Sequence, residues 1–72
     1  MVKTQSSLGN HLKELRARHN LTQAELAAKV SVTRKTINTV ENNVFIPTTV
    51  LALKLAKALD VKVEELFYLN KP

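Results

Sequence analysis

Residues 22–42 read TQAELAAKVSVTRKTINTVEN and predict two short helices joined by a tight turn. Thr22, followed three residues later by Glu25, makes a capping box, which starts the first helix. Thr33 is a second candidate N-cap, so the second helix should begin directly after it. Apolar residues recur at helical spacing and give each helix one buried face: Leu26, Ala27 and Val30 in the first, Ile37 and Val40 in the second.

The second of these helices has a polar outer face. The small side chain of Ala27 lets the two helices cross closely, so the remaining side chains of the second helix point outward: Arg34, Lys35, Thr36, Asn38 and Thr39. Such side chains read base edges and hold phosphates. The arrangement is typical of a helix-turn-helix motif, whose second helix enters the major groove of DNA with its N-terminal residues leading.

Two long patterns carry a resemblance to a known family. They are LxxLRxxxxLTQxELAxxVxVTRxTIxxVEN, from Leu12 to Asn42, and PTxxxALKLAKALDVxVEELF, from Pro47 to Phe67. Together they resemble the Cro-type, lambda-repressor-like helix-turn-helix family of transcriptional regulators (XRE-type), in the form of a short stand-alone member. The resemblance spans about residues 8–69. It implies an all-α fold of five helices with the helix-turn-helix at the second and third, and a bacterial, archaeal or phage origin.

Length and composition limit the kinds of protein that this chain can be. The 72 residues suit one small domain, which we expect over residues 8–69, between an extended or flexible arm (1–7) and a short tail (70–72). The absence of cysteine excludes disulfides and thiolate metal sites. No apolar run reaches the ~20 residues of a membrane span, and no signal peptide opens the chain. We therefore expect a cytoplasmic protein without membrane contact.

The formal net charge is +5, and the excess is uneven. Residues 1–43 carry seven Lys or Arg against three Glu, whereas residues 44–72 carry four against three Asp or Glu. The positive charge therefore accompanies the predicted helix-turn-helix, as expected for a surface that binds nucleic acid. Many small soluble proteins are mildly basic, so the charge alone decides little.

Four side chains of the second helix are candidates for reading bases. Arg34 and Lys35 lie on its first turn and reach guanine O6 and N7, although only arginine does so with two hydrogen bonds. Asn38, one turn later, suits adenine, and Thr39 suits either a thymine methyl group or a phosphate. The alternative for each is an ordinary solvated helix face.

A second group is expected to hold phosphates. Thr36 fits this role through its hydroxyl, and Asn42 and Asn43 are expected to offer backbone donors at the helix end. The resemblance assigns Gln23 a phosphate contact together with the amides that open the first helix of the motif. It also implies a bridge between Arg16 and the glutamate of VEN, here Glu41, which leaves guanidinium donors for a phosphate.

The flanking segments complete the expected fold. Leu8, Leu12 and Leu15 predict a first helix from about residue 7 or 8 to residue 19, with Asn20 as a left-handed C-cap. Thr48 or Thr49 should cap a fourth helix, after an apolar linker. In this linker Phe45 is expected to pack over the core, the alternative being a subunit contact. A short fifth helix should begin near Val63. In the family this region commonly supplies a dimer interface, which here would comprise Phe67, Tyr68 and Leu69.

Glycines that are usual in the family are replaced at three turns. Ser31 stands at the turn of the motif, Asn43 follows the second helix, and Asp60 follows the fourth. A non-glycine residue in the left-handed region costs roughly 1 kcal/mol. Because Asn and Asp tolerate this region better than most residues, Ser31 is the unusual replacement.

The sequence thus predicts a transcriptional regulator, most simply a repressor that binds a palindromic operator as a homodimer. The alternative is an antitoxin or another protein-interaction module that retains a DNA-binding helix-turn-helix. No catalytic constellation, glycine-rich phosphate loop or cofactor motif favours an enzyme, and no small-molecule effector site is evident. His11 and His19 lie too far apart in sequence for one helical metal site.

Overall fold

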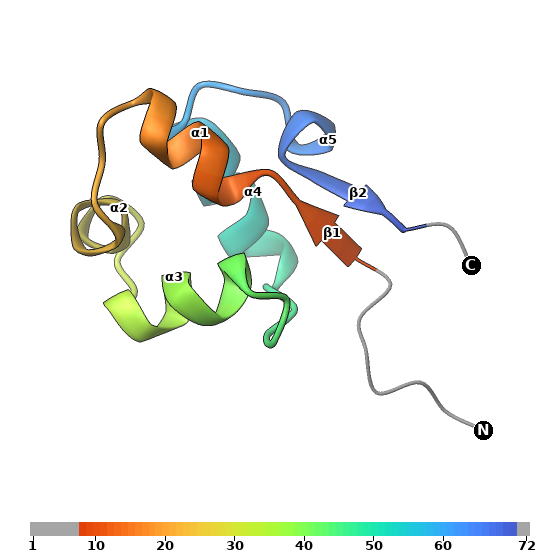
Figure 1. Ribbon diagram of the computed structural model, residues 1–72, viewed down its shortest axis with the longest axis horizontal. Helices are drawn as coiled ribbons and strands as arrows, with labels where there is room; N and C mark the ends of the chain where they lie inside the picture. The colour runs from red at the N-terminus through yellow and green to blue at the C-terminus, as the bar shows by residue number, and fades with distance from the viewer. Residues whose placement is uncertain (1–7, 71–72) are drawn as a thin grey trace.

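The computed structural model describes residues 8–70, so the predicted arm (1–7) and the last two residues of the predicted tail lie outside the described part. Five helices and a two-stranded antiparallel sheet form the domain (Figure 1). In chain order they are β1 (Leu8–Asn10), α1 (Leu12–Arg18), α2 (Gln23–Lys29), α3 (Arg34–Glu41), α4 (Thr49–Ala58), α5 (Val63–Leu66) and β2 (Phe67–Leu69).

The two strands correct the expectation of an all-α fold. Leu8, Gly9 and Asn10 pair with Leu69, Tyr68 and Phe67, respectively. The first helix therefore begins at Leu12 rather than at residue 7 or 8. The Oδ1 atom of Asn10 accepts the N–H of Leu12 at 2.9 Å, and the N–H of His11 donates to the carbonyl of Leu66. These bonds direct the chain from the sheet into α1, and helical periodicity alone gave no sign of them.

The lack of a side chain at Gly9 lets the ring of Tyr68, the sole tyrosine, pack on the sheet. A Cβ atom at Gly9 would lie 2.3 Å from Cε1 of Tyr68, so the tyrosine ring covers the glycine backbone. The ring of His11 lies beside the same tyrosine, with ring centroids 4.8 Å apart. In Figure 1 the sheet lies on the opposite side of the domain from α2.

Threonine caps start three of the helices. The Oγ1 atoms of Thr22, Thr33 and Thr48 accept backbone N–H groups three residues later. At Thr22 the carboxylate of Glu25 completes the predicted capping box, because it accepts the N–H of Thr22 at 2.8 Å. The alternative cap for α4, Thr49, is instead the first residue of that helix.

Left-handed residues reverse the chain after four helices. Asn20, Ser31, Asn43 and Asp60 have φ angles of 56°, 61°, 59° and 56°. The predicted left-handed C-cap at Asn20 is confirmed. Ser31 adopts the conformation for which the family uses glycine, so the turn of the motif stores the expected strain of roughly 1 kcal/mol.

Aliphatic side chains from every helix fill the core. It comprises Leu12, Leu15, Leu26, Ala27, Val30, Ile37, Val40, Leu51, Leu55, Ala56, Leu59 and Leu66. Burial of each Leu, Ile or Val side chain among them stabilises the fold by about 1.5–3 kcal/mol. Among the helices of residues 8–70, none combines the length and apolarity needed to cross a membrane.

Candidate nucleic-acid interface

The α2–turn–α3 unit presents α3 at the surface. In Figure 1, α2 is seen end-on whereas α3 runs across the view, so the two helices cross steeply. Ala27 is 2% exposed at their contact, and its carbonyl accepts the N–H of Val32 at 3.0 Å, which closes the turn. This crossing leaves Arg34, Lys35 and Asn38 exposed along α3.

A partly buried ion pair joins α1 to α3. Nε and Nη2 of Arg16 donate to the two carboxylate oxygens of Glu41 at 2.6 and 3.3 Å. Nη1 of Arg16 donates to the carbonyl of Leu21 at 2.8 Å, within the segment that connects α1 to α2. The two side chains are only 15% and 5% exposed. The pair implied by the resemblance therefore fixes the relative placement of α1, α2 and α3, and its guanidinium has little surface left for a phosphate.

Gln23 extends this network to the outer face of α3. Its Nε2 donates to Oδ1 of Asn38 at 3.2 Å and to Oε1 of Glu41 at 3.1 Å. Both amide hydrogens of Gln23 thus have acceptors inside the protein. In this arrangement Gln23 orients Asn38, and a phosphate contact from its amide nitrogen would require these two bonds to open.

The backbone N–H groups at the end of α3 are already bonded to carbonyls of that helix. The N–H groups of Asn42 and Asn43 donate to the carbonyls of Asn38 and Val40, each at 3.1 Å. No main-chain donor of the predicted kind is therefore left for a phosphate at these two residues. The Nδ2 of Asn42 donates to Oδ1 and to the carbonyl oxygen of Asn38.

Asn10 is a structural residue that sequence reasoning missed. Its Nδ2 donates to the carbonyl of Val40 and to Oδ1 of Asn43, both at 3.0 Å. Asn10 therefore ties β1 to the C-terminal end of α3. Its place two residues before Leu12, where α1 begins, is a capping signal that the sequence shows. Its other partners, Val40 and Asn43, lie far along the chain and give no such signal.

The base-reading candidates differ in how their donors are used. In the part of the chain that the structure describes, the side chains of Arg34 and Lys35 form no ion pair or hydrogen bond. Asn38 accepts two side-chain bonds through Oδ1, while its Nδ2 donates none within residues 8–70. The exposed face of α3 thus presents two unpaired cations and one oriented amide donor.

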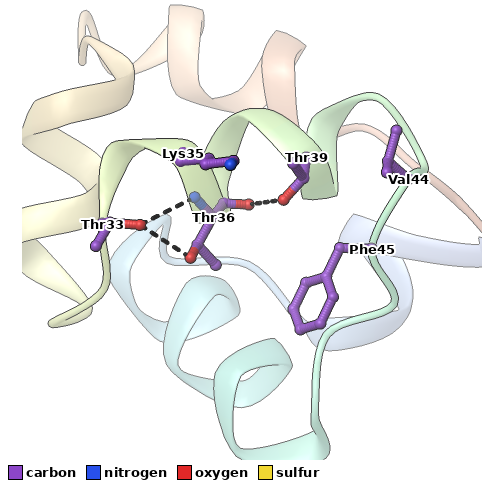
Figure 2. A pocket seen from close by; sticks show the side chains of 6 residues that line it. All are labelled: Thr33, Lys35, Thr36, Thr39, Val44 and Phe45. Atoms are coloured by element: carbon purple, nitrogen blue, oxygen red, sulfur yellow. Dashed lines mark hydrogen bonds between the residues drawn. The ribbon is translucent and has the colours of Figure 1, made fainter.

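Two open hollows flank α3. The α2-side hollow, of about 410 Å³, is lined by polar and charged residues, namely Gln23, Arg34, Lys35 and Asn38. The loop-side hollow, of about 350 Å³, lies between α3 and the α3–α4 loop (Figure 2) and is lined by Thr33, Lys35, Thr36, Thr39, Val44 and Phe45. Lys35 lines both hollows. Phe45, which we expected over the core, is 43% exposed and forms a wall of the second hollow.

The hydroxyls of the loop-side hollow are bonded locally. Oγ1 of Thr39 donates to the carbonyl of Thr36 at 2.9 Å, and the hydroxyls of Thr33 and Thr36 lie 3.1 Å apart (Figure 2). The phosphate role predicted for Thr36 would therefore compete with its bond to Thr33.

An apolar surface lies away from α3. Leu53 and Leu69 are 55% and 78% exposed, and Tyr68 is 42% exposed. A hollow of about 260 Å³, here called the α4–sheet hollow, includes Leu53 in its lining, which comprises Leu8, Pro47, Thr49, Ala52, Leu53, Val63 and Phe67. Tyr68 and Leu69 of the predicted dimer interface are thus exposed, whereas Phe67 is half-buried against the core.

Metal chemistry has no visible support in the described residues. Within residues 8–70 no three His, Asp or Glu side chains gather as a metal site would require. The ring Nε2 of His19 instead lies 2.8 Å from the carbonyl of Leu59, at the end of α4.

Comparisons with known proteins agree with this geometry. A family model described as "Helix-turn-helix" matches residues 12–66. The chain is 42% identical to the uncharacterized HTH-type transcriptional regulator YgzD of Bacillus subtilis (strain 168), over 86% of this chain and 94% of YgzD. It is 48% identical to the uncharacterized HTH-type transcriptional regulator MJ0272 of Methanocaldococcus jannaschii, over 81% and 88% of the two chains.

One solved structure gives a similar picture. The restriction-modification controller protein C.AhdI from Aeromonas hydrophila superimposes with a TM-score of 0.71 at 37% identity, over 75% of this chain and 78% of that protein.

Proposed function

The chain belongs to the helix-turn-helix family of DNA-binding transcriptional regulators, and we propose that it is a repressor that binds a palindromic operator as a homodimer, with α3 in the major groove. The observation that carries this proposal is the outer face of α3. There Arg34, Lys35 and Asn38 are exposed together, next to one another on consecutive turns of a helix whose opposite face is buried.

Base reading follows from the chemistry of these three side chains. The guanidinium of Arg34 suits guanine O6 and N7, and Lys35 suits the same acceptors or a phosphate. Because Gln23 donates to Oδ1 of Asn38, the Nδ2 group of Asn38 is the donor that remains for a base edge. An acceptor such as adenine N7 suits it. A bidentate pair, such as the one Arg34 would make with guanine, discriminates against a wrong base by about 1–3 kcal/mol.

The apolar surface around the α4–sheet hollow supports the homodimer. Leu53 and Phe67 line this hollow, and Leu53, Tyr68 and Leu69 are exposed. Exposed apolar side chains of this kind are often buried against a partner in soluble proteins. A two-fold dimer formed there would present two copies of α3 to half-sites about 34 Å apart on one face of the duplex. Phe67 would contribute from the floor of this surface.

Repression is the simplest consequence of such binding. A dimer that occupies an operator overlapping a promoter excludes polymerase sterically, and this needs no surface beyond those that bind DNA and the second copy. The similarity to a controller protein, C.AhdI, supports a regulatory role of this general kind.

Selection of bound sequences from a random duplex pool tests the proposal. We expect wild-type protein to recover a palindromic consensus, and Arg34→Ala and Asn38→Ala each to relax the preferred base at one or two positions per half-site. Lys57→Ala is the matched control, because it removes one exposed charge on α4, away from the face of α3. Recovery of no motif by the wild type would contradict sequence-specific binding.

Sedimentation equilibrium tests the dimer separately. We expect Leu69→Asp to dissociate the wild-type dimer, because it places a charge in an apolar interface. A wild-type protein that stays monomeric at high concentration, both free and on the selected duplex, would contradict the two-fold arrangement.

A further inference from the structure

We propose that the loop-side hollow receives the apolar surface of one operator strand, namely a deoxyribose and the 5-methyl group of a thymine, which contact Phe45 and Val44. This inference rests on the proposed function, because it takes α3 to lie in the major groove. It adds a specificity-determining contact that lies outside α3 and uses no hydrogen bond or charge.

The α3–α4 loop is folded so that it offers side chains rather than amides. The N–H groups of Val44 and Phe45 both donate to the carbonyl of Thr39, at 2.9 and 3.2 Å. These bonds hold the loop against α3 and use the donors that a loop at this place would otherwise offer to a phosphate. Val44 is 76% exposed and Phe45 is 43% exposed, so the loop presents apolar surface to whatever lies beside α3.

The threonine wall of the hollow is equally suited to apolar contact. The hydroxyl of Thr39 donates to the carbonyl of Thr36, and the hydroxyls of Thr33 and Thr36 bond to each other (Figure 2). Because these groups have partners inside the protein, covering the hollow leaves none of them unsatisfied. Phe45 and the methyl groups of threonine are side-chain groups that pack on a thymine methyl in the major groove.

The position of the hollow points to DNA as its occupant. A helix in the major groove has one backbone strand on each side, and α3 has one hollow on each side. The α2-side hollow has polar walls and would face one strand, whereas the loop-side hollow would face the other. Lys35 lines both, so a phosphate of either strand can approach its ammonium group.

The charge at the rim argues against an apolar protein segment as occupant. Lys35 is the charged residue that lines the loop-side hollow, and it has no ion-pair partner within residues 8–70. A nucleotide unit supplies what this hollow lacks, because its sugar and methyl group are apolar and its phosphate is an anion. The two strands of the operator would then be held by different chemistry, polar on the α2 side and apolar on the loop side.

Affinity measured as a function of salt separates this contact from an electrostatic one. On the duplex selected by the wild type, we expect Phe45→Ala to bind about ten-fold more weakly and Val44→Ala about three-fold more weakly. In both variants the slope of log K against log salt should stay that of the wild type, because no phosphate contact is removed. Lys35→Ala should instead lower that slope by about one.

Ile46→Ala is the matched control. Ile46 is the next apolar residue of the same loop and is 60% exposed, but it does not line this hollow. Its replacement should leave both affinity and salt slope unchanged. Phe45 also lines another hollow, together with Leu51 of α4, so Phe45→Ala can lower the stability of the fold. Val44 is largely exposed, and Val44→Ala keeps the test valid if Phe45→Ala fails to fold.

Replacement of single thymines by deoxyuracil identifies the methyl group. We expect one thymine per half-site at which its loss weakens wild-type binding about four-fold, the value for one buried methyl group. In Phe45→Ala the same replacement should have almost no further effect.

Wild-type affinity in both Phe45→Ala and Val44→Ala would overturn the inference, as would a lowered salt slope in either. These results would leave the proposed function intact, provided that the wild type still selects an operator. Loss of a protein partner by these two variants, with DNA binding unchanged, would assign the hollow to that partner and would equally overturn the inference.

Discussion

Replacement of Arg16 by alanine should remove about 3–5 kcal/mol of stability, because it leaves the carboxylate of Glu41 charged and nearly without solvent. That carboxylate is 5% exposed, and its other donor in the described chain is Nε2 of Gln23 at 3.1 Å. The variant also loses the donor to the carbonyl of Leu21, worth about 1 kcal/mol and included in this range. A chain of this size is stable by roughly 4–11 kcal/mol, so the loss is a large fraction of the total.

Thermal and urea unfolding followed by circular dichroism measure this loss. A destabilisation of this size lowers the melting temperature by roughly 12–40 °C in a domain of this length. Arg18→Ala is the matched control, since Arg18 lies on the same helix, is exposed and should change stability by less than about 0.5 kcal/mol.

A second substitution separates the buried charge from the lost packing. In Arg16→Ala/Glu41→Gln no carboxylate is left without its cation, so the double variant should be more stable than Arg16→Ala alone. If Arg16→Ala unfolded within about 0.5 kcal/mol of the wild type, the argument that this pair fixes α1 against α3 would be refuted. Equal stability of the single and double variants would assign the loss to packing instead of charge.

Substitutions at three further positions test the fold. Gly9→Ala should push the ring of Tyr68 outward and lower the free energy of unfolding by about 1 kcal/mol. The outward ring should be quenched more strongly by iodide, and because Tyr68 is the single tyrosine, unchanged quenching of tyrosine fluorescence would contradict the close approach. Ser31→Gly should raise the free energy of unfolding in urea by up to ~1 kcal/mol, whereas Ser31→Val should lower it. Ile37→Ala should cost about 2–5 kcal/mol in the same assay, since Ile37 is fully buried; a loss below 1 kcal/mol would contradict its core position.

The features that sequence predicted well depend on contacts within a few residues. Thr22 and Thr33 cap helices because their side chains reach the N–H group three residues later, and this requires nothing from the rest of the chain. The left-handed turn at Asn20 follows in the same way, because Asn20 comes directly after the C-cap of α1. The left-handed conformation of Ser31 was instead implied by the resemblance, since the family has glycine at this turn.

The strands could not be predicted for the opposite reason. Leu8 lies at helical spacing from Leu12 and Leu15, so periodicity placed it in the first helix. Its partner in the sheet is Leu69, at the other end of the described chain. Local propensity contains no information about such a pairing, because the two strands stand at opposite ends of the described chain. Phe45 was misplaced for a different reason, since the bonds that hold its loop are local: the N–H groups of Val44 and Phe45 donate to the carbonyl of Thr39 at the end of α3, and helical periodicity does not describe the chain beyond a helix end.

The same distinction decides how far the site could be predicted. Helical spacing correctly indicates that Arg34, Lys35 and Asn38 are exposed, whereas Thr36 and Thr39, also expected to point outward, are half-buried. It does not indicate which donors already have acceptors. Gln23 is expected to contact a phosphate, whereas its Nε2 donates to Oδ1 of Asn38 and to Oε1 of Glu41. Arg34 lies on the same face with its donors unpaired within residues 8–70. In the selection experiment the two residues should therefore differ. Arg34→Ala should relax the base preference at one position. Gln23→Ala should leave Asn38 misoriented, so that it weakens binding and relaxes the base preference at the position that Asn38 reads. Equal loss of affinity on every sequence by Gln23→Ala would instead return Gln23 to the phosphate role.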